Sequence, residues 1–170
     1  MNSMATQKWL LLLMLLFATY ACSPIQVLDQ EPAENFSLSS YRTFNFYEID
    51  ASGDSLNSNT YQNGIASLKT EIRQQLQKRG LQLGEHDPDL LVNIGIVIKA
   101  DAPRYIVQKR YQVESEEGAK YTEGTVSVHL VDRVNNKLVW RGVVEGVVPD
   151  RPASLQRNVA DAMEVLFKGI

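Results

Sequence analysis

The spacing of the apolar residues changes along this chain, and this change is the feature that most constrains its fold. Between residues 41 and 47 the side chains alternate with a period of two and are rich in aromatic residues, which predicts a strand. From Thr60 to Arg79 apolar side chains recur every three or four positions, which is the spacing of one helix face. Strand-like segments follow from residue 90, and helical spacing returns from Ala153 to Lys168. This order predicts an α+β domain.

Four strands are expected between the two helices. Leu90 to Lys99 is apolar and β-branched on both faces, which is typical of a central strand. Arg104 to Val113 is more amphipathic, and two further segments, Tyr121 to Asp132 and Leu138 to Val148, are joined by a short hairpin connection. We predict the order β-α-β-β-β-β-α, in a single, mostly antiparallel sheet of about five strands with both helices packed on one face. The first strand could pair in parallel with Leu90–Lys99 across the first helix.

Each predicted helix carries one apolar stripe, which should pack against the sheet. Gly80 is placed to end the first helix in a left-handed conformation. The expected stripe residues are Ile65, Leu68, Ile72 and Leu76 in the first helix, and Leu155, Val159, Met163 and Leu166 in the second.

Length and charge limit the classes of function that this chain can have. Its 170 residues suit one ordinary domain, and its hydrophobic content of 44% is enough to form a core. Lys8 is the only charged residue before Cys22, so the chain from Cys22 onward carries 16 basic and 20 acidic residues and a net charge of −4. A protein that binds phosphate backbones needs a basic face. We therefore expect no nucleic-acid partner and no electrostatic docking to anionic lipid.

The amino-terminal segment has the composition of an export signal. Lys8 supplies the positive charge, and Trp9 to Phe17 is an unbroken apolar run of nine residues. That run is too short to span a bilayer, which takes about 20 apolar residues. Ala21 and Cys22 follow, and this junction resembles a lipobox, where the cysteine thiol receives a diacylglyceryl group and becomes the new amino terminus. We expect residues 1–21 to be a cleaved lipoprotein signal peptide.

Cys22 is the only cysteine in the chain, which favours lipidation over plain secretion or an uncleaved membrane helix. A secreted protein has little use for one unpaired thiol, whereas a lipoprotein requires one. The junction departs from the usual lipobox at Thr19, where leucine is common, and at the bulky Tyr20. Ser23 follows the cysteine, and without an aspartate there the sorting rule favours the outer membrane. Anchoring through acyl chains on Cys22 would hold the protein to the membrane.

The segment after the lipidation site is expected to be a flexible tether. Residues 22–37 include Pro24 and Pro32 and few consecutive apolar residues, so we interpret them as the acylated amino terminus and a linker. Residues 38–170 should then form a single α+β domain.

Four blocks of the sequence, in this order, resemble an uncharacterised family of bacterial lipoproteins, domain of unknown function 4136 (DUF4136). The resemblance covers roughly residues 36–167 and implies the address and fold described above, with no established activity, cofactor or catalytic residue. In that family the first strand usually ends in tryptophan, whereas Phe46 and Tyr47 stand here. The four blocks are Ser40–Phe44, Lys78–Leu81, Asp87–Val92, and Tyr121–Thr125 followed by Lys137–Gly142.

Two groups of titratable residues could carry chemistry. Asp87 and Asp89 flank Pro88 and could bind a hard cation or act in acid–base catalysis, but turn formation is the simpler interpretation. His86 and His129 are the only histidines, and a zinc site needs three or four ligands. We therefore expect no metal, no cofactor and no catalytic residues, with His129 on a strand surface.

Aromatic residues supply the remaining candidate contacts. Trp140 is expected to fill the core, although it could stack on a ligand, and Arg141 should point the other way, toward Glu123 or Glu145. Tyr105 and Tyr111 precede the acidic turn at residues 114–117 and Tyr121 follows it, and these tyrosines could form a recognition surface for a partner.

These observations predict a non-enzymatic, membrane-anchored envelope lipoprotein that binds or scaffolds another envelope protein, peptidoglycan or a lipid. One alternative is a hydrolase of envelope material that uses Asp87, Asp89 or His129. A second alternative is an assembly subunit that pairs through a sheet edge.

Overall fold

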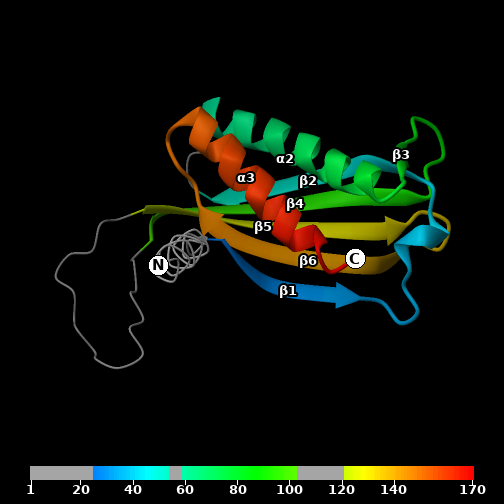
Figure 1. Ribbon diagram of the computed structural model, residues 1–170. Helices are drawn as coiled ribbons and strands as arrows, with labels where there is room; N and C mark the ends of the chain where they lie inside the picture. The colour runs from blue at the N-terminus through cyan, green and yellow to red at the C-terminus, as the bar shows by residue number, and fades with distance from the viewer. Residues whose placement is uncertain (1–24, 54–58, 103–120) are drawn as a thin grey trace, which may run out of the picture.

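A computed structural model describes residues 25–53, 59–102 and 121–170, which form one sheet covered by two helices (Figure 1). Some of the sequence predictions fall outside the described residues. They concern the signal peptide with Cys22 and the strand from Arg104 to Val113, which contains Tyr105 and Tyr111.

The sheet has six strands in the order β1-β6-β5-β4-β2-β3. Neighbouring strands are antiparallel except for β2, which runs parallel to both β4 and β3. The predicted α+β class and the parallel pair around the first helix are therefore confirmed. The strands are β1 (Gln26–Pro32), β2 (Thr43–Gly53), β3 (Gln82–Leu83), β4 (Leu90–Ala102), β5 (Tyr121–Asp132) and β6 (Lys137–Val147), with a short 3-10 turn, η2 (Leu38–Ser40), before β2.

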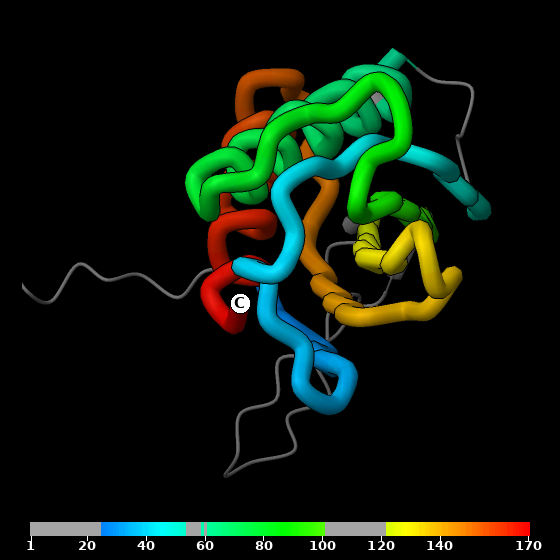
Figure 2. Tube along the Cα trace, turned by 90° about the vertical axis from the view of Figure 1, so that its right-hand side faces the viewer, coloured from blue at the N-terminus to red at the C-terminus, as the bar shows by residue number. Residues whose placement is uncertain are grey.

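Two helices, α2 (Asn59–Lys78) and α3 (Pro152–Phe167), lie on the same face of the sheet and contact each other. Figure 2 views the molecule roughly along the strands, with both helices on one side. The predicted apolar stripes face inward: Leu68, Ile72 and Leu76 of α2 are buried. The helix α2 ends as predicted, because Gly80 takes a φ of +91° and the Leu81 amide donates to the Leu76 carbonyl.

The core lies between the helices and one face of the sheet. Trp140 of β6 is 1% exposed and packs against Phe167 of α3, with ring centroids 5.3 Å apart. Gly142, two residues further along the same face of β6, leaves room for this ring, because a Cβ there would overlap it and approach Leu166 to 2.8 Å.

The predicted flexible tether over residues 22–37 is wrong for its central part. Residues 26–32 form β1, an edge strand that pairs antiparallel with β6. Ile25 and Val27 pack against the core, and Gln30 Nε2 donates to the Leu166 carbonyl at 2.5 Å. The backbone of this polar segment is ordered because β6 offers it a row of hydrogen bonds, which a sequence pattern does not reveal.

Candidate functional site

A cavity of about 300 Å³ lies between the two helices and the sheet. It sits where β4 and β6 end, where β5 begins, and beside the first turns of α2 and α3. Most of its wall is aliphatic, because the apolar faces of five elements diverge at this end of the sheet. The aliphatic lining includes Ile65, Leu68, Ile96, Ile98, Leu155 and Met163.

Ile25, which precedes β1, also lines the cavity. This residue is half-buried and packs against the core, so the amino-terminal end of the described chain lies at the cavity wall.

A few polar residues accompany the aliphatic wall. The lining includes Tyr61 of α2, Asn158 of α3, Glu145 of β6 and Asp150. The Glu145 carboxylate itself accepts a hydrogen bond from Thr125 Oγ1 on the outer face of the sheet. Burial raises the pKa of the Tyr61 hydroxyl, with a smaller contribution from the negative charge of Asp50. Asn158 Nδ2 donates to the Val147 carbonyl at 3.1 Å, which ties α3 to the end of β6. The arrangement is an apolar pocket with few polar groups, which is the usual composition of a small-molecule site.

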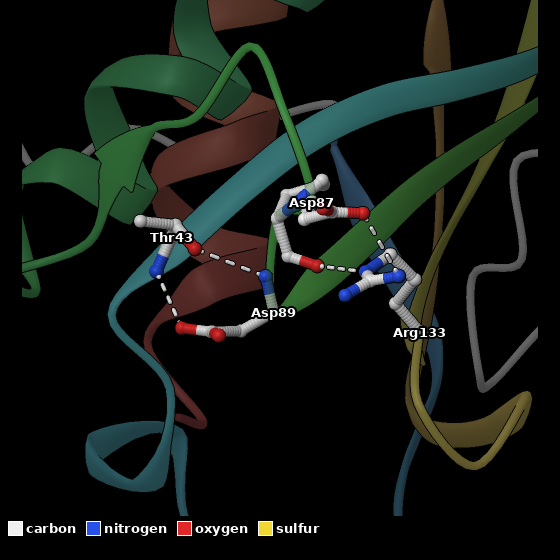
Figure 3. Close-up of polar contacts among 5 residues, drawn as sticks. Thr43, Asp87, Asp89 and Arg133 are labelled. Carbon is white, nitrogen blue, oxygen red and sulfur yellow. Dashed lines mark hydrogen bonds and ion pairs between the residues drawn. The ribbon is translucent and has the colours of Figure 1, made fainter.

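Asp87 and Asp89 lie at the end of the sheet opposite the cavity (Figure 3). There Asp89 is hydrogen-bonded to the start of β2 and Asp87 forms an ion pair with Arg133. The Asp89 carboxylate accepts hydrogen bonds from the amides of Arg42 and Thr43 at 2.7 and 2.9 Å, and these bonds lower its pKa. Asp87 takes a φ of +46° and forms an ion pair with Arg133 at 3.2 Å. The sequence favours local turn formation, whereas Asp89 bonds the distant start of β2 and Asp87 pairs with Arg133, just after β5.

His129 does not join these aspartates. It is half-buried on β5, between Asn93 of β4 and Arg141 of β6. Asn93 is four residues along β4 from Asp89, a separation of roughly 13 Å at about 3.3 Å per residue. Burial, and then the charge of Arg141, lower the pKa of His129. The hydrolytic constellation suggested from the sequence is therefore not assembled by these side chains.

The structure places the other predicted contacts elsewhere. Trp140 is in the core, so its suggested ligand stacking is not supported. Arg141 points away from the helices, as predicted, but it pairs with Asp29 at 3.4 Å and with Glu31 at 3.7 Å rather than with the expected partners on β5 and β6. This correction follows from β1, which brings its two carboxylates alongside β6.

Sequence reasoning missed the cavity itself. The one sequence feature that could have indicated the cavity is Gly64, which interrupts the inward-facing side of α2 one turn before Leu68. In the described part of the chain no helix is both long and apolar enough to cross a membrane. Within the same residues no cluster of three or more histidine, cysteine or acidic side chains is arranged to hold a metal ion.

Known structures share this fold at low sequence identity. A PDZ domain protein from Parabacteroides distasonis is 15% identical, with a TM-score of 0.52; the match covers 84% of this chain and 35% of that one. A DUF4136 family protein from Bacteroides thetaiotaomicron is 10% identical over 87% of this chain and 96% of that one, with a TM-score of 0.49. A PelC dodecamer from Paraburkholderia phytofirmans is 10% identical over 84% and 96%, with a TM-score of 0.45.

The comparison with curated proteins gave no match. The comparison with family profiles matched residues 26–169 to the family described as domain of unknown function, DUF4136. The matched range begins with β1 and ends just after α3, so it includes every strand and helix described above. The chain therefore belongs to the DUF4136 family.

Proposed function

We propose that this protein is a lipid-anchored, non-enzymatic binding module of the cell envelope, which holds an apolar ligand in the cavity beneath α2 and α3. The observation that carries the proposal is the cavity of about 300 Å³ with its aliphatic wall. This volume is at the lower end of the range of roughly 300–1,000 Å³ that is usual for ligand pockets. The anchor would be the lipid on Cys22 predicted from the sequence, most simply in the outer membrane.

Gly64 supports the use of this cavity. A glycine inside a helix costs about 1 kcal/mol relative to alanine, so it needs a reason. Close packing is not that reason, because a Cβ at position 64 would be in ordinary contact with the Leu155 side chain at 3.7 Å. Since Gly64 lines the cavity, its effect is to leave the space empty for another molecule.

Filling the cavity from within should abolish ligand binding while keeping the fold. We expect Gly64→Leu to weaken the binding of the neutral dye N-phenyl-1-naphthylamine by about tenfold or more, because the new side chain takes the buried space. Dye fluorescence is measured on the full chain in nanodiscs, with empty nanodiscs subtracted. The matched control is Gln62→Leu, which adds the same side chain at an exposed position of α2. Equal dye affinity in both variants would refute the pocket as the binding site.

Membrane attachment should depend on one sulfur atom. We expect Cys22→Ala to abolish acylation of the amino terminus, because this thiol is the only one in the chain. Mass spectrometry of the amino-terminal peptide measures the lipid directly, and Ser23→Ala serves as the control. An unacylated amino terminus in the natural protein would rule out the anchor, whatever the pocket binds.

Assembly through a sheet edge has less support. The edge strand β1 has a bulge between Val27 and Asp29 and ends in Pro32. At the other side of the sheet, β2 has an irregular register between Phe46 and Ile49. Bulges, charges and proline on outer strands are features that discourage pairing with another chain.

A further inference from the structure

The cavity begins very close to the predicted membrane anchor. Ile25 lines the cavity and is three residues after Cys22. Three extended residues span at most about 11 Å. With a lipid on Cys22, the cavity wall at Ile25 must therefore lie within about 11 Å of the acylated residue, which itself sits at the bilayer surface.

From this placement we propose that the ligand is an acyl chain of a membrane lipid whose polar head is uncharged or carries an amine. The proposal rests on the proposed function and on the lipid at Cys22. A protein held this near the bilayer meets lipid chains before any other apolar molecule. The aliphatic side chains of Ile96, Ile98, Leu155 and Met163 would bury the chain, which is favourable in proportion to the apolar area removed from water.

The charged residues that line the cavity determine which lipid head group it would accept. Among the described residues that line the cavity, the charged ones are Glu145 and Asp150, and both are acidic. Glu145 follows the inward-facing Val144, and its carboxylate accepts a hydrogen bond from Thr125 Oγ1 on the outer face of the sheet, which leaves Asp150 as the carboxylate at the cavity. No lysine or arginine in this set could pair with a carboxylate or a phosphate monoester. A free fatty acid would bring its own negative charge toward Asp150, which is unfavourable. A neutral glycerol ester or an ethanolamine head avoids this repulsion.

Met163 gives a direct test, because it lines the cavity and is the only methionine after Cys22. The full chain is expressed in a bacterial envelope with photo-methionine, which carries a small diazirine in place of the thioether. Irradiation then attaches whatever lies in the cavity to residue 163. We expect the peptide that contains this residue to carry the mass of a glycerolipid, and we expect Gly64→Leu to reduce that adduct by about tenfold.

A matched variant separates the cavity from general contact with lipid. Met163→Leu combined with Leu28→Met moves the diazirine to a residue of β1 that is 48% exposed and six residues after Cys22. We expect far fewer lipid adducts at residue 28 than at residue 163. Equal adducts at the two positions would mean that nearby bilayer, not the cavity, supplies the lipid, and would overturn the proposal.

The head group is tested by competition for the dye-binding site. The glycerol monoester of dodecanoic acid should displace the dye from the full chain in nanodiscs at a lower concentration than dodecanoate itself. If dye binding depends on Gly64 but neither lipid competes and residue 163 gives no lipid adduct, the binding function stands and the lipid proposal fails. If dye binding is insensitive to Gly64→Leu, the proposed function fails first.

Discussion

Replacing Trp140 with alanine should lower the free energy of unfolding by about 3–5 kcal/mol, the usual cost of removing a large aromatic side chain from a core. The ring is 1% exposed and packs on Phe167, and Gly142 leaves the space that it fills. The strand β6 cannot shift toward α3 to close the gap, because it is hydrogen-bonded to β5 on one side and to β1 on the other. Urea denaturation followed by far-ultraviolet circular dichroism measures the change.

Leu138→Ala is the matched control for this experiment. Leu138 belongs to the same strand, two residues before Trp140, but its side chain is 48% exposed. Its removal should cost less than about 1 kcal/mol, in the range of surface substitutions. If the two variants unfold at the same urea concentration, Trp140 is not the core residue that the structure describes.

Asp89→Ala should lower the free energy of unfolding by about 2–3 kcal/mol. A hydrogen bond to a charged group contributes about 1.5–3 kcal/mol. The carboxylate accepts two such bonds, but it is only partly shielded from water, which reduces their combined contribution. Its loss leaves the amides of Arg42 and Thr43, at 2.7 and 2.9 Å from the carboxylate, without their acceptor. These bonds join the start of β2 to the start of β4, and the two strands pair in parallel. Thermal or urea unfolding at neutral pH measures the loss.

The same residue should shape the stability in acid. The hydrogen bonds from the amides of Arg42 and Thr43 lower the pKa of Asp89 in the folded chain, so the unfolded chain binds a proton more readily. The stabilisation is therefore present above the ordinary carboxyl pKa and is lost as the pH falls from there through the lowered value. In Asp89→Ala this part of the acid dependence should disappear, although the part due to Asp132, whose pKa the Asn135 amide lowers, remains.

Asp87→Ala is the control for the stability measurement. This exposed residue pairs with Arg133 at the surface, where ion pairs contribute little. We expect a much smaller change in stability. An acid profile that is the same in Asp89→Ala as in the parent chain would contradict the role assigned to Asp89.

The long periodic segments could be predicted from the sequence, whereas β1 could not. The stripes of α2 and α3, and the alternation in β5 and β6, extend over ten or more residues, so their periods are unambiguous. Before the bulge only Val27 of β1, and Ile25 just ahead of the strand, pack against the core. Apart from the exposed Leu28 and the terminal Pro32, the other residues of this edge strand are polar. Four residues of alternation are too few to distinguish a strand from a linker.

The turn around Pro88 could also be predicted, because aspartate beside proline favours a turn. The hydrogen bonds that Asp89 accepts from β2 could not, because their donors are 46 and 47 positions away in the sequence. The cavity depends instead on how five elements diverge at one end of the sheet, from Ile25 to Met163. No local pattern encodes that separation. Gly64 is the exception, since a glycine on the inward side of a helix can indicate reserved space.

The position of β1 has a mechanical consequence for an anchored protein. Among the described strands β1 pairs with β6 alone, and its first residue, Gln26, is four residues after Cys22, the proposed site of the lipid. A pull from the bilayer would act on this end and break the bonds of the ladder one after another, as a zipper opens, instead of loading them all together. The strand would thus yield at low force and leave the body of the domain folded, so that the link to the membrane lengthens under tension and re-forms when the tension ends.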